Sequence, residues 1–149
     1  MKILLGIIGF VIVVILLWLQ SKRDAQKIER AFSGREFLST EQFYDSYFRE
    51  QGVPFHVVVG VRKVLAEQFD VDMSRLSAAD DFSENLHFLW DFDSMADVEI
   101  ILALEKQFGI QISDQEAEKA VTVRDIVNLV CEKIGVEIVG WVSGSVTQQ

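Results

Sequence analysis

The sequence predicts an all-helical protein in which a single transmembrane helix precedes a small antiparallel bundle of four helices. Three observations support this prediction. Residues 3–19 form an uncharged run that contains only Ile, Leu, Val, Gly, Phe and Trp. Apolar residues recur at helical spacing within 55–69, 96–109 and 123–134. Residues 53–134 contain neither an internal repeat nor the strong alternation of apolar and polar residues that is typical of strands.

The apolar run at residues 3–19 is near the lower length limit for crossing a bilayer. Trp18 lies at its edge, where an indole ring fits the membrane interface. A cleaved signal peptide and a buried core helix are the alternatives. However, residues 20–24 give a poor cleavage site, and a core helix is seldom apolar on every face. The sequence therefore favours an uncleaved membrane anchor at residues 1–20.

The basic residues beside the apolar run predict its orientation. Lys2 alone precedes the run, whereas a group of basic residues follows it. These are Lys22, Arg23, Lys27, Arg30 and Arg35. Because positively charged flanks stay on the cytoplasmic side, we expect a single-pass protein of the cell (inner) membrane with a cytoplasmic C-terminal domain. Cys131 is the only cysteine, so no disulfide framework points to an oxidising compartment.

Residues 21–52 are expected to form a polar connector that contains a short amphipathic helix. Ser39 and Gln42 have the spacing of a capping box, which marks the start of a helix. Phe43 and Tyr47 lie four residues apart and therefore share one side of that helix. We expect these rings to pack on the main domain; a partner-binding aromatic stripe is the alternative.

The main domain is expected at residues 53–134 and the C-terminal tail at residues 135–149. The predicted helices of the domain are at 55–69, 96–109, 115–120 and 123–134. Pro54 suits the first turn of the first of these helices. A loop of about twenty residues follows that helix, and loops of this length are usually functional or carry a short helix of their own. The tail has three glycines and little charge, which leaves a strand-like flap or disorder open.

The main domain is strongly acidic. Residues 53–134 hold sixteen Asp and Glu against seven Lys and Arg. This balance argues against nucleic acid as a partner. It favours basic protein partners, which the negative field would steer towards the domain. Solubility alone would also account for the charge.

Other chemical sites are not supported by the sequence. The acidic groups at 70–72 and 91–93 lack the glycine that a calcium loop needs at its sixth position. His56 and His87 have no partners at zinc-ligand spacing, so no metal site is expected. Neither a nucleophile–base pair nor a phosphate-binding glycine loop is present. Cys131 lies in an apolar run and is interpreted as a core residue.

Ser94 stands directly before the helix predicted at 96–109. With Asp97 it has the spacing of a capping box, and a serine in this position is usually only a structural cap. The residues that follow it change this interpretation, because residues 93–127 resemble an acyl carrier protein. The resemblance rests on Asp93-Ser94-Met95, Val98-Glu99-Ile100, Ala103 to Ile110, Ile112 to Glu118 and Val121 to Val127.

The resemblance implies a role for Ser94. Its hydroxyl would be joined through a phosphodiester to 4′-phosphopantetheine from coenzyme A, by a separate phosphopantetheinyl transferase. The terminal thiol would then carry an acyl group as a thioester, and the protein itself would catalyse nothing. A phosphodiester at a helix N-terminus is also physically favourable. Asp93, Asp97, Glu99 and Glu105 would face basic patches of acyl-transferring or synthase enzymes.

The segment between Leu86 and Asp93 is longer than the connection usual in this family and contains no glycine. Residues 87–92 are largely apolar and precede the expected attachment site. Four roles remain open for them: covering the arm, binding a specialised partner, touching the membrane, or filling the end of the bundle.

The sequence thus favours a membrane-tethered acyl carrier protein that holds an acyl thioester on the arm of Ser94. Its location suggests delivery to partner enzymes of lipid or cell-envelope synthesis, a setting that includes fatty acid biosynthesis. The alternative is a membrane-anchored adaptor that uses the same bundle for protein docking, with Ser94 only as a cap. A weaker alternative is assembly with other membrane proteins through residues 3–19.

Overall fold

The computed structural model describes residues 2–91 and 96–138. The chain divides into two compact units, Met1–Gly34 and Arg35–Gln149. The predicted attachment residue Ser94 and most of the predicted tail lie outside the described residues.

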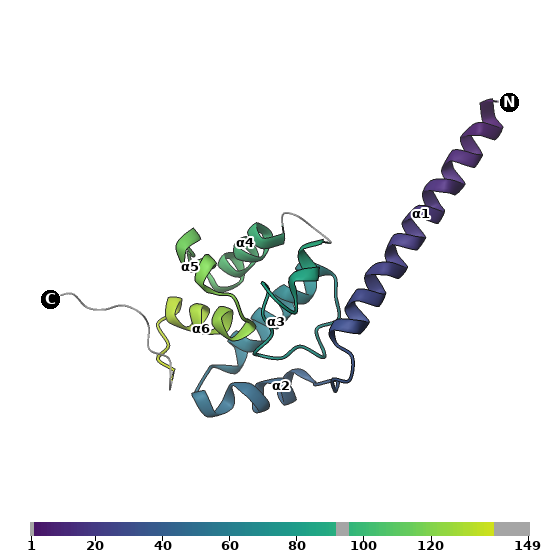
Figure 1. Cartoon of the computed structure of the whole chain (residues 1–149). Helices are drawn as coiled ribbons and strands as arrows, with labels where there is room; N and C mark the ends of the chain where they lie inside the picture. The colour runs from purple at the N-terminus through teal and green to yellow at the C-terminus, as the bar shows by residue number, and fades with distance from the viewer. Residues whose placement is uncertain (1, 92–95, 139–149) are drawn as a thin grey trace. The chain divides into compact units, whose positions relative to one another are not determined.

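The first unit is a single long helix, α1 (Lys2–Ala31) (Figure 1). At 30 residues it is about 45 Å long, from the rise of an α-helix. Among the described residues, Gly6–Ala31 is the one helix that is long and apolar enough to cross a membrane. Near the end of the apolar run, the Lys22 ammonium lies 3.8 Å from the centre of the Trp18 ring. The apolar N-terminal helix that the sequence predicts is therefore confirmed.

The second unit is also helical. Its elements are α2 (Thr40–Tyr47), η1 (Arg49–Gln51), α3 (Phe55–Phe69), η2 (His87–Asp91), α4 (Ala96–Phe108), α5 (Asp114–Lys119) and α6 (Val123–Lys133). In the part of the chain that the structure describes, the only β pairing is an isolated bridge between Asp81 and Thr122. These helices confirm the all-α fold and the predicted bundle.

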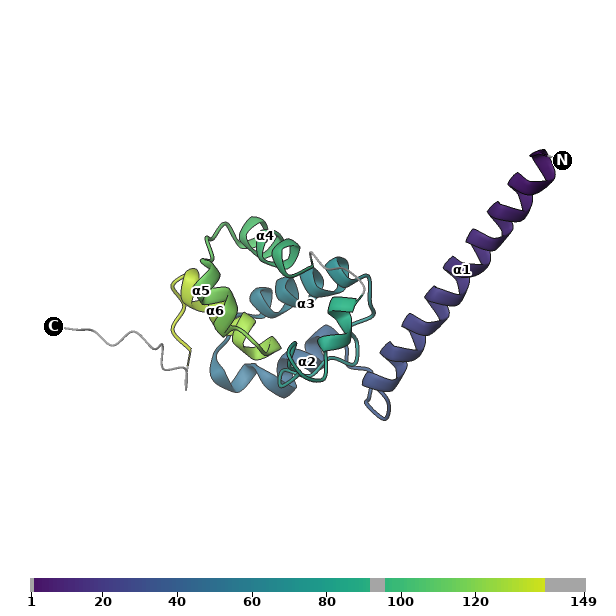
Figure 2. The same cartoon turned by 45° about the horizontal axis from the view of Figure 1, so that its top comes forward.

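Helix α3 forms the centre of this unit. It packs against α4, α6 and α2, and α2 lies on the opposite side of α3 from α4 (Figures 1 and 2). Its apolar side chains are buried at Val57, Val58, Val61, Val64, Leu65 and Phe69. Gly60 allows α4 to approach closely, because a methyl group at this position would lie 2.5 Å from Phe108 Cζ.

Side-chain caps define where several helices begin. Ser39 and Gln42 form the predicted capping box at the start of α2. Ser113 with Glu116 and Thr122 with Asp125 form the same arrangement at α5 and α6. In each box a side-chain oxygen accepts a hydrogen bond from a backbone N–H that the helix itself leaves unpaired.

The loop between α3 and η2 packs on the start of α6. The backbone N–H of Phe82 donates to Val121 O at 2.9 Å, and Val123 N–H donates to Asp80 O at 3.0 Å. Buried apolar side chains along this loop include Leu76, Ala78, Phe82 and Leu86. The loop is therefore part of the core, and it leads the chain to the N-terminal end of α4.

Candidate functional site

The N-terminal end of α4 follows Ser94 by two residues in the sequence. Ser94 and Asp93 both lie outside the described residues, and the described chain resumes at the buried Ala96. An α-helix leaves its first N–H groups without partners within the helix, and its dipole makes this end electropositive. The dipole of α4 thus favours negative charge at the helix N-terminus, the end that is nearest to Ser94 in the sequence.

The acidic residues that are predicted to contact a partner differ in their exposure. Asp97 and Glu99 are exposed in the first turn of α4, and Asp97 Oδ1 accepts a hydrogen bond from Val98 N–H at 2.8 Å. Glu105 is only partly exposed, and its Oε1 accepts a hydrogen bond from Ile112 N–H at 2.7 Å. One oxygen of Glu105 is therefore used to hold the turn between α4 and α5.

A largely apolar cavity of about 600 Å³ lies along α4, α5 and α6. It begins beside the first turn of α4, at Asp97 and Val98, and continues to Leu104 on α4 and Leu129 on α6. Its volume is in the range of small-molecule sites, which are typically lined by apolar side chains. The cavity therefore has the size and the lining that suit a small apolar group.

Residues of η2 pack into the bundle next to this cavity. Leu89 is fully buried, and the indole N–H of Trp90 donates to Phe82 O at 2.8 Å. The Trp90 ring lies 5.4 Å from the ring of Phe69 and 5.8 Å from that of Phe82, between ring centres. Of the four roles left open for this segment, this packing supports the filling of the bundle end.

Trp90 and Phe82 also line the cavity. Sequence reasoning did not assign them to the site, because their positions depend on contacts between the loop, η2 and α3. The available signal was the apolar character of residues 87–92, immediately before the expected attachment site.

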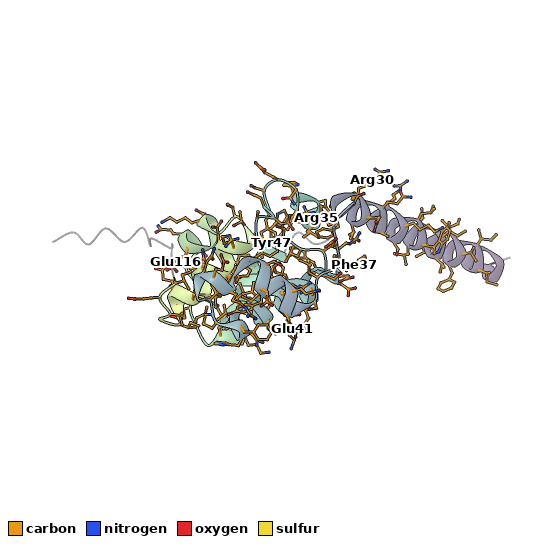
Figure 3. All side chains as sticks on the ribbon, turned by 90° about the horizontal axis from the view of Figure 1, so that it is seen from below. Arg30, Arg35, Phe37, Glu41, Tyr47 and Glu116 are labelled. Atoms are coloured by element: carbon orange, nitrogen blue, oxygen red, sulfur yellow. The ribbon has the colours of Figure 1, made fainter. Side chains whose placement is uncertain are left out.

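Helix α5 is held beside the cavity by polar contacts of Glu116. Lys133 Nζ lies 2.6 Å from Glu116 Oε1, and Ser113 N–H donates to Glu116 Oε2 at 2.8 Å. Hydrogen bonds from Lys133 and Ser113 lower the pKa of Glu116 to about 2. Glu116, labelled in Figure 3, therefore joins α5 to α6 while it is ionised.

Cys131 lies in the core on α6 and is fully buried. Burial raises the pKa of its thiol to about 11, which keeps it protonated at neutral pH. A protonated thiol is a poor nucleophile. This agrees with the interpretation of Cys131 as a core residue.

Comparison with known proteins identifies the second unit. A protein-family model described as "Phosphopantetheine attachment site" matches residues 59–130, a range that contains most of α3, all of α4 and α5, and most of α6. The acyl carrier protein of Thermosynechococcus vestitus is 38% identical over 74 residues, which cover 50% of this chain and 86% of that protein. The acyl carrier protein of a Picosynechococcus species is 37% identical over 75 residues, which cover 50% of this chain and 88% of that protein. The chain therefore belongs to the acyl carrier protein family, whose members are carriers rather than enzymes and use phosphopantetheine as their prosthetic group.

Proposed function

We propose that this protein is a membrane-tethered acyl carrier protein that bears 4′-phosphopantetheine on Ser94. One observation carries the proposal: the family match over residues 59–130 includes Ser94, and α4 begins just after it, at Ala96. The prosthetic group supplies a terminal thiol on which an acyl group is held as a thioester. Delivery of that group to partner enzymes is the function.

The surroundings of Ser94 fit this group. A phosphodiester on the serine would lie beside the N-terminal end of α4, where the helix dipole favours negative charge. The apolar cavity begins next to this end, at Asp97 and Val98. The same region thus suits both the phosphodiester of the arm and an apolar acyl group.

The partners we propose are a phosphopantetheinyl transferase and acyl-transferring or synthase enzymes with basic patches. Asp97 and Glu99 are exposed on α4 and are available to such patches. Asp93 is the proposed third contact, next to the attachment residue in the sequence. Glu105 is proposed with them, through the oxygen that Ile112 does not use.

We propose that α1 anchors the carrier in the cell (inner) membrane, with the second unit in the cytoplasm. The apolar composition of α1 and the basic residues after residue 19 support this topology. Tethering raises the local concentration of the carried group near membrane enzymes. Lipid or cell-envelope synthesis is the setting that this location favours.

The mass of the intact protein tests the attachment site. The protein is co-expressed with a phosphopantetheinyl transferase, and we expect one phosphopantetheine increment. Ser94→Ala should abolish the increment. Ser113→Ala is a matched control, because Ser113 also caps a helix and its loss should leave the increment unchanged. A folded protein that gains no mass with any competent transferase contradicts the carrier function and favours the docking adaptor.

Membrane fractionation tests the anchor separately. We expect the full-length chain in the membrane fraction and a variant that lacks residues 1–20 in the soluble fraction. A full-length protein that stays soluble contradicts the anchor, whatever its mass shows about Ser94.

A further inference from the structure

Residues 35–52, called here the docked segment, lie against the carrier bundle instead of forming a free connector. At the start of the segment, Arg35 Nη1 lies 2.8 Å from Asp80 Oδ2, and Leu38 N–H donates to Ser74 O at 2.8 Å. Asp80 is almost fully buried, at 3% exposure. The segment therefore meets the bundle from its first residue.

Two arginines of the bundle hold the docked segment. Arg62 of α3 donates to Leu38 O at 2.7 Å, and Arg124 of α6 donates to Tyr47 O at 3.1 Å. Burial lowers the pKa of Arg62 below its usual value, and the Coulombic attraction of Asp72 partly offsets this effect. Figure 3 views the unit from the side of α2 and labels Tyr47.

Apolar burial strengthens this attachment. Phe43 and Phe48 are each 1% exposed. Their rings also face the two arginines: the Arg62 guanidinium lies 4.9 Å from the centre of the Phe43 ring, and that of Arg124 lies 5.3 Å from the Phe48 ring. A fully buried aromatic side chain contributes roughly 1.5–3 kcal/mol relative to an exposed one. The docked segment is thus a structural part of the second unit.

The docked segment shortens the tether between the anchor and the carrier. Helix α1 ends at Ala31, and Arg35 already belongs to the second unit. Only residues 32–34 connect them, and three residues span at most about 11 Å. The twelve helical residues from 20 to 31 add about 18 Å. If residues 35–52 were not docked, residues 32–52 could instead extend to about 75 Å beyond the end of α1.

We propose that this short tether confines the carried acyl group to a layer next to the membrane surface. The enzymes that load or unload the carrier are then embedded in the same membrane or bound to it. This inference rests on the proposed anchoring of α1, and it restricts the partners to a class that the family match does not specify. A carrier on a long free connector would also serve enzymes that remain in the bulk cytoplasm.

Energy transfer to a labelled bilayer tests the tether. The full-length protein is placed in vesicles of phosphatidylcholine and phosphatidylglycerol that contain an acceptor-labelled lipid. A donor dye is attached through Glu118→Cys, because Glu118 is exposed on α5 and the native Cys131 is buried. The test variant carries about 20 Gly and Ser residues between Gly34 and Arg35, which add an average span of about 25 Å.

We expect the insertion to lower energy transfer by about half, because the added coil moves the donor away from the membrane. The same insertion after Gln149 is the matched control and should leave energy transfer unchanged. Equal energy transfer with and without the insertion at Gly34 overturns the short-tether inference.

A variant that lacks residues 1–20 distinguishes a failure of the proposed membrane anchoring from a failure of the short tether. If the full-length protein shows no more energy transfer than this variant, the proposed membrane anchoring fails, and the inference fails with it. If the full-length protein shows more energy transfer but the insertion at Gly34 has no effect, only the short tether fails. The donor is not on the arm, so neither result depends on modification of Ser94.

Discussion

Arg62 donates a hydrogen bond from Nη2 to the carbonyl oxygen of Leu38 across 2.7 Å. The same guanidinium donates to Met73 O through Nε at 3.1 Å and through Nη2 at 2.9 Å. One side chain of α3 thus joins the docked segment to the loop that follows α3. The family match begins at residue 59, so the structural unit is larger than the matched range and includes residues 35–58.

Arg62→Met should lower the free energy of unfolding of the second unit by about 2–3 kcal/mol. The substitution leaves the half-buried Leu38 O and the buried Met73 O without their charged donor, and a carbonyl that is left unpaired away from water is costly. Urea unfolding of the full chain in mild detergent, followed by circular dichroism, measures the change.

Lys63→Met is the matched control for this substitution. Lys63 is the next residue of α3, but it is exposed and forms only a 3.8 Å pair with the exposed Glu67. We expect a change within about 0.5 kcal/mol. Equal effects at both positions would contradict a specific role of Arg62.

The helices could be predicted from the sequence because local patterns determine them. Apolar residues at helical spacing marked α3, α4 and α6, and the Ser39–Gln42 capping box marked the start of α2. The attachment of the docked segment could not be predicted in this detail. Arg62 reaches Leu38, 24 residues earlier in the chain, and it binds a backbone carbonyl, which leaves no signature in the side-chain sequence.

In the candidate site, too, the parts set by local sequence could be predicted, and the parts set by tertiary contacts could not. The helix that carries Asp97 and Glu99 could be predicted from contiguous sequence, whereas Ser94 lies outside the described residues and its role stays a prediction. The cavity is lined by Phe82 and Trp90 as well as by α4, and the positions of these two side chains depend on how the loop after α3 folds back. Glu105 illustrates the difference. The sequence suggests an exposed carboxylate, whereas in the structure this carboxylate accepts a hydrogen bond from Ile112 N–H.

Trp90→Phe should lower the free energy of unfolding by about 1 kcal/mol, the usual net contribution of one hydrogen bond. The substitution keeps an aromatic ring against Phe69 and Phe82 but removes the indole N–H that donates to Phe82 O. Chemical unfolding measures the loss. His87→Ala in the same η2 is the control, because His87 is exposed. A Trp90→Phe variant as stable as the wild type would show that this hydrogen bond contributes nothing measurable.

Protonation of Glu116 should lower the stability of the second unit in acid. Its pKa is lowered from 4.5 to about 2 by hydrogen bonds from Lys133 and Ser113. A carboxyl group with a lowered folded-state pKa stabilises the fold above its unfolded pKa, and this contribution is lost as the pH falls. We therefore expect the contribution to be complete above pH 4.5 and to decline towards pH 2.

Thermal unfolding of Glu116→Gln across this pH range measures the effect. The variant should be less stable than the wild type above pH 4.5, and the difference should shrink towards pH 2. Glu118→Gln, at an exposed position of the same helix, is the control and should show no such convergence. A constant difference between Glu116→Gln and the wild type at every pH would contradict the assignment.

Cys131 should not react with a thiol reagent while the protein is folded. Its side chain is fully buried, and burial raises the pKa of the thiol to about 11, so both access and the thiolate fraction are low at pH 8. Before attachment of the arm, the native protein should therefore show no fast-reacting thiol, and unfolding should release one. After attachment, the folded protein should show one fast-reacting thiol, at the end of the arm.

The Glu118→Cys variant calibrates this measurement, because its added thiol lies at an exposed position of α5. Ser94→Ala, treated with the transferase, should react as slowly as the unmodified wild type. If Cys131 in the folded wild type reacts as fast as the thiol of the Glu118→Cys variant, the packing of α6 against the core is wrong. If the modified protein gains a fast thiol that Ser94→Ala lacks, that thiol belongs to the arm, and the buried Cys131 does not compete with it for an acyl group.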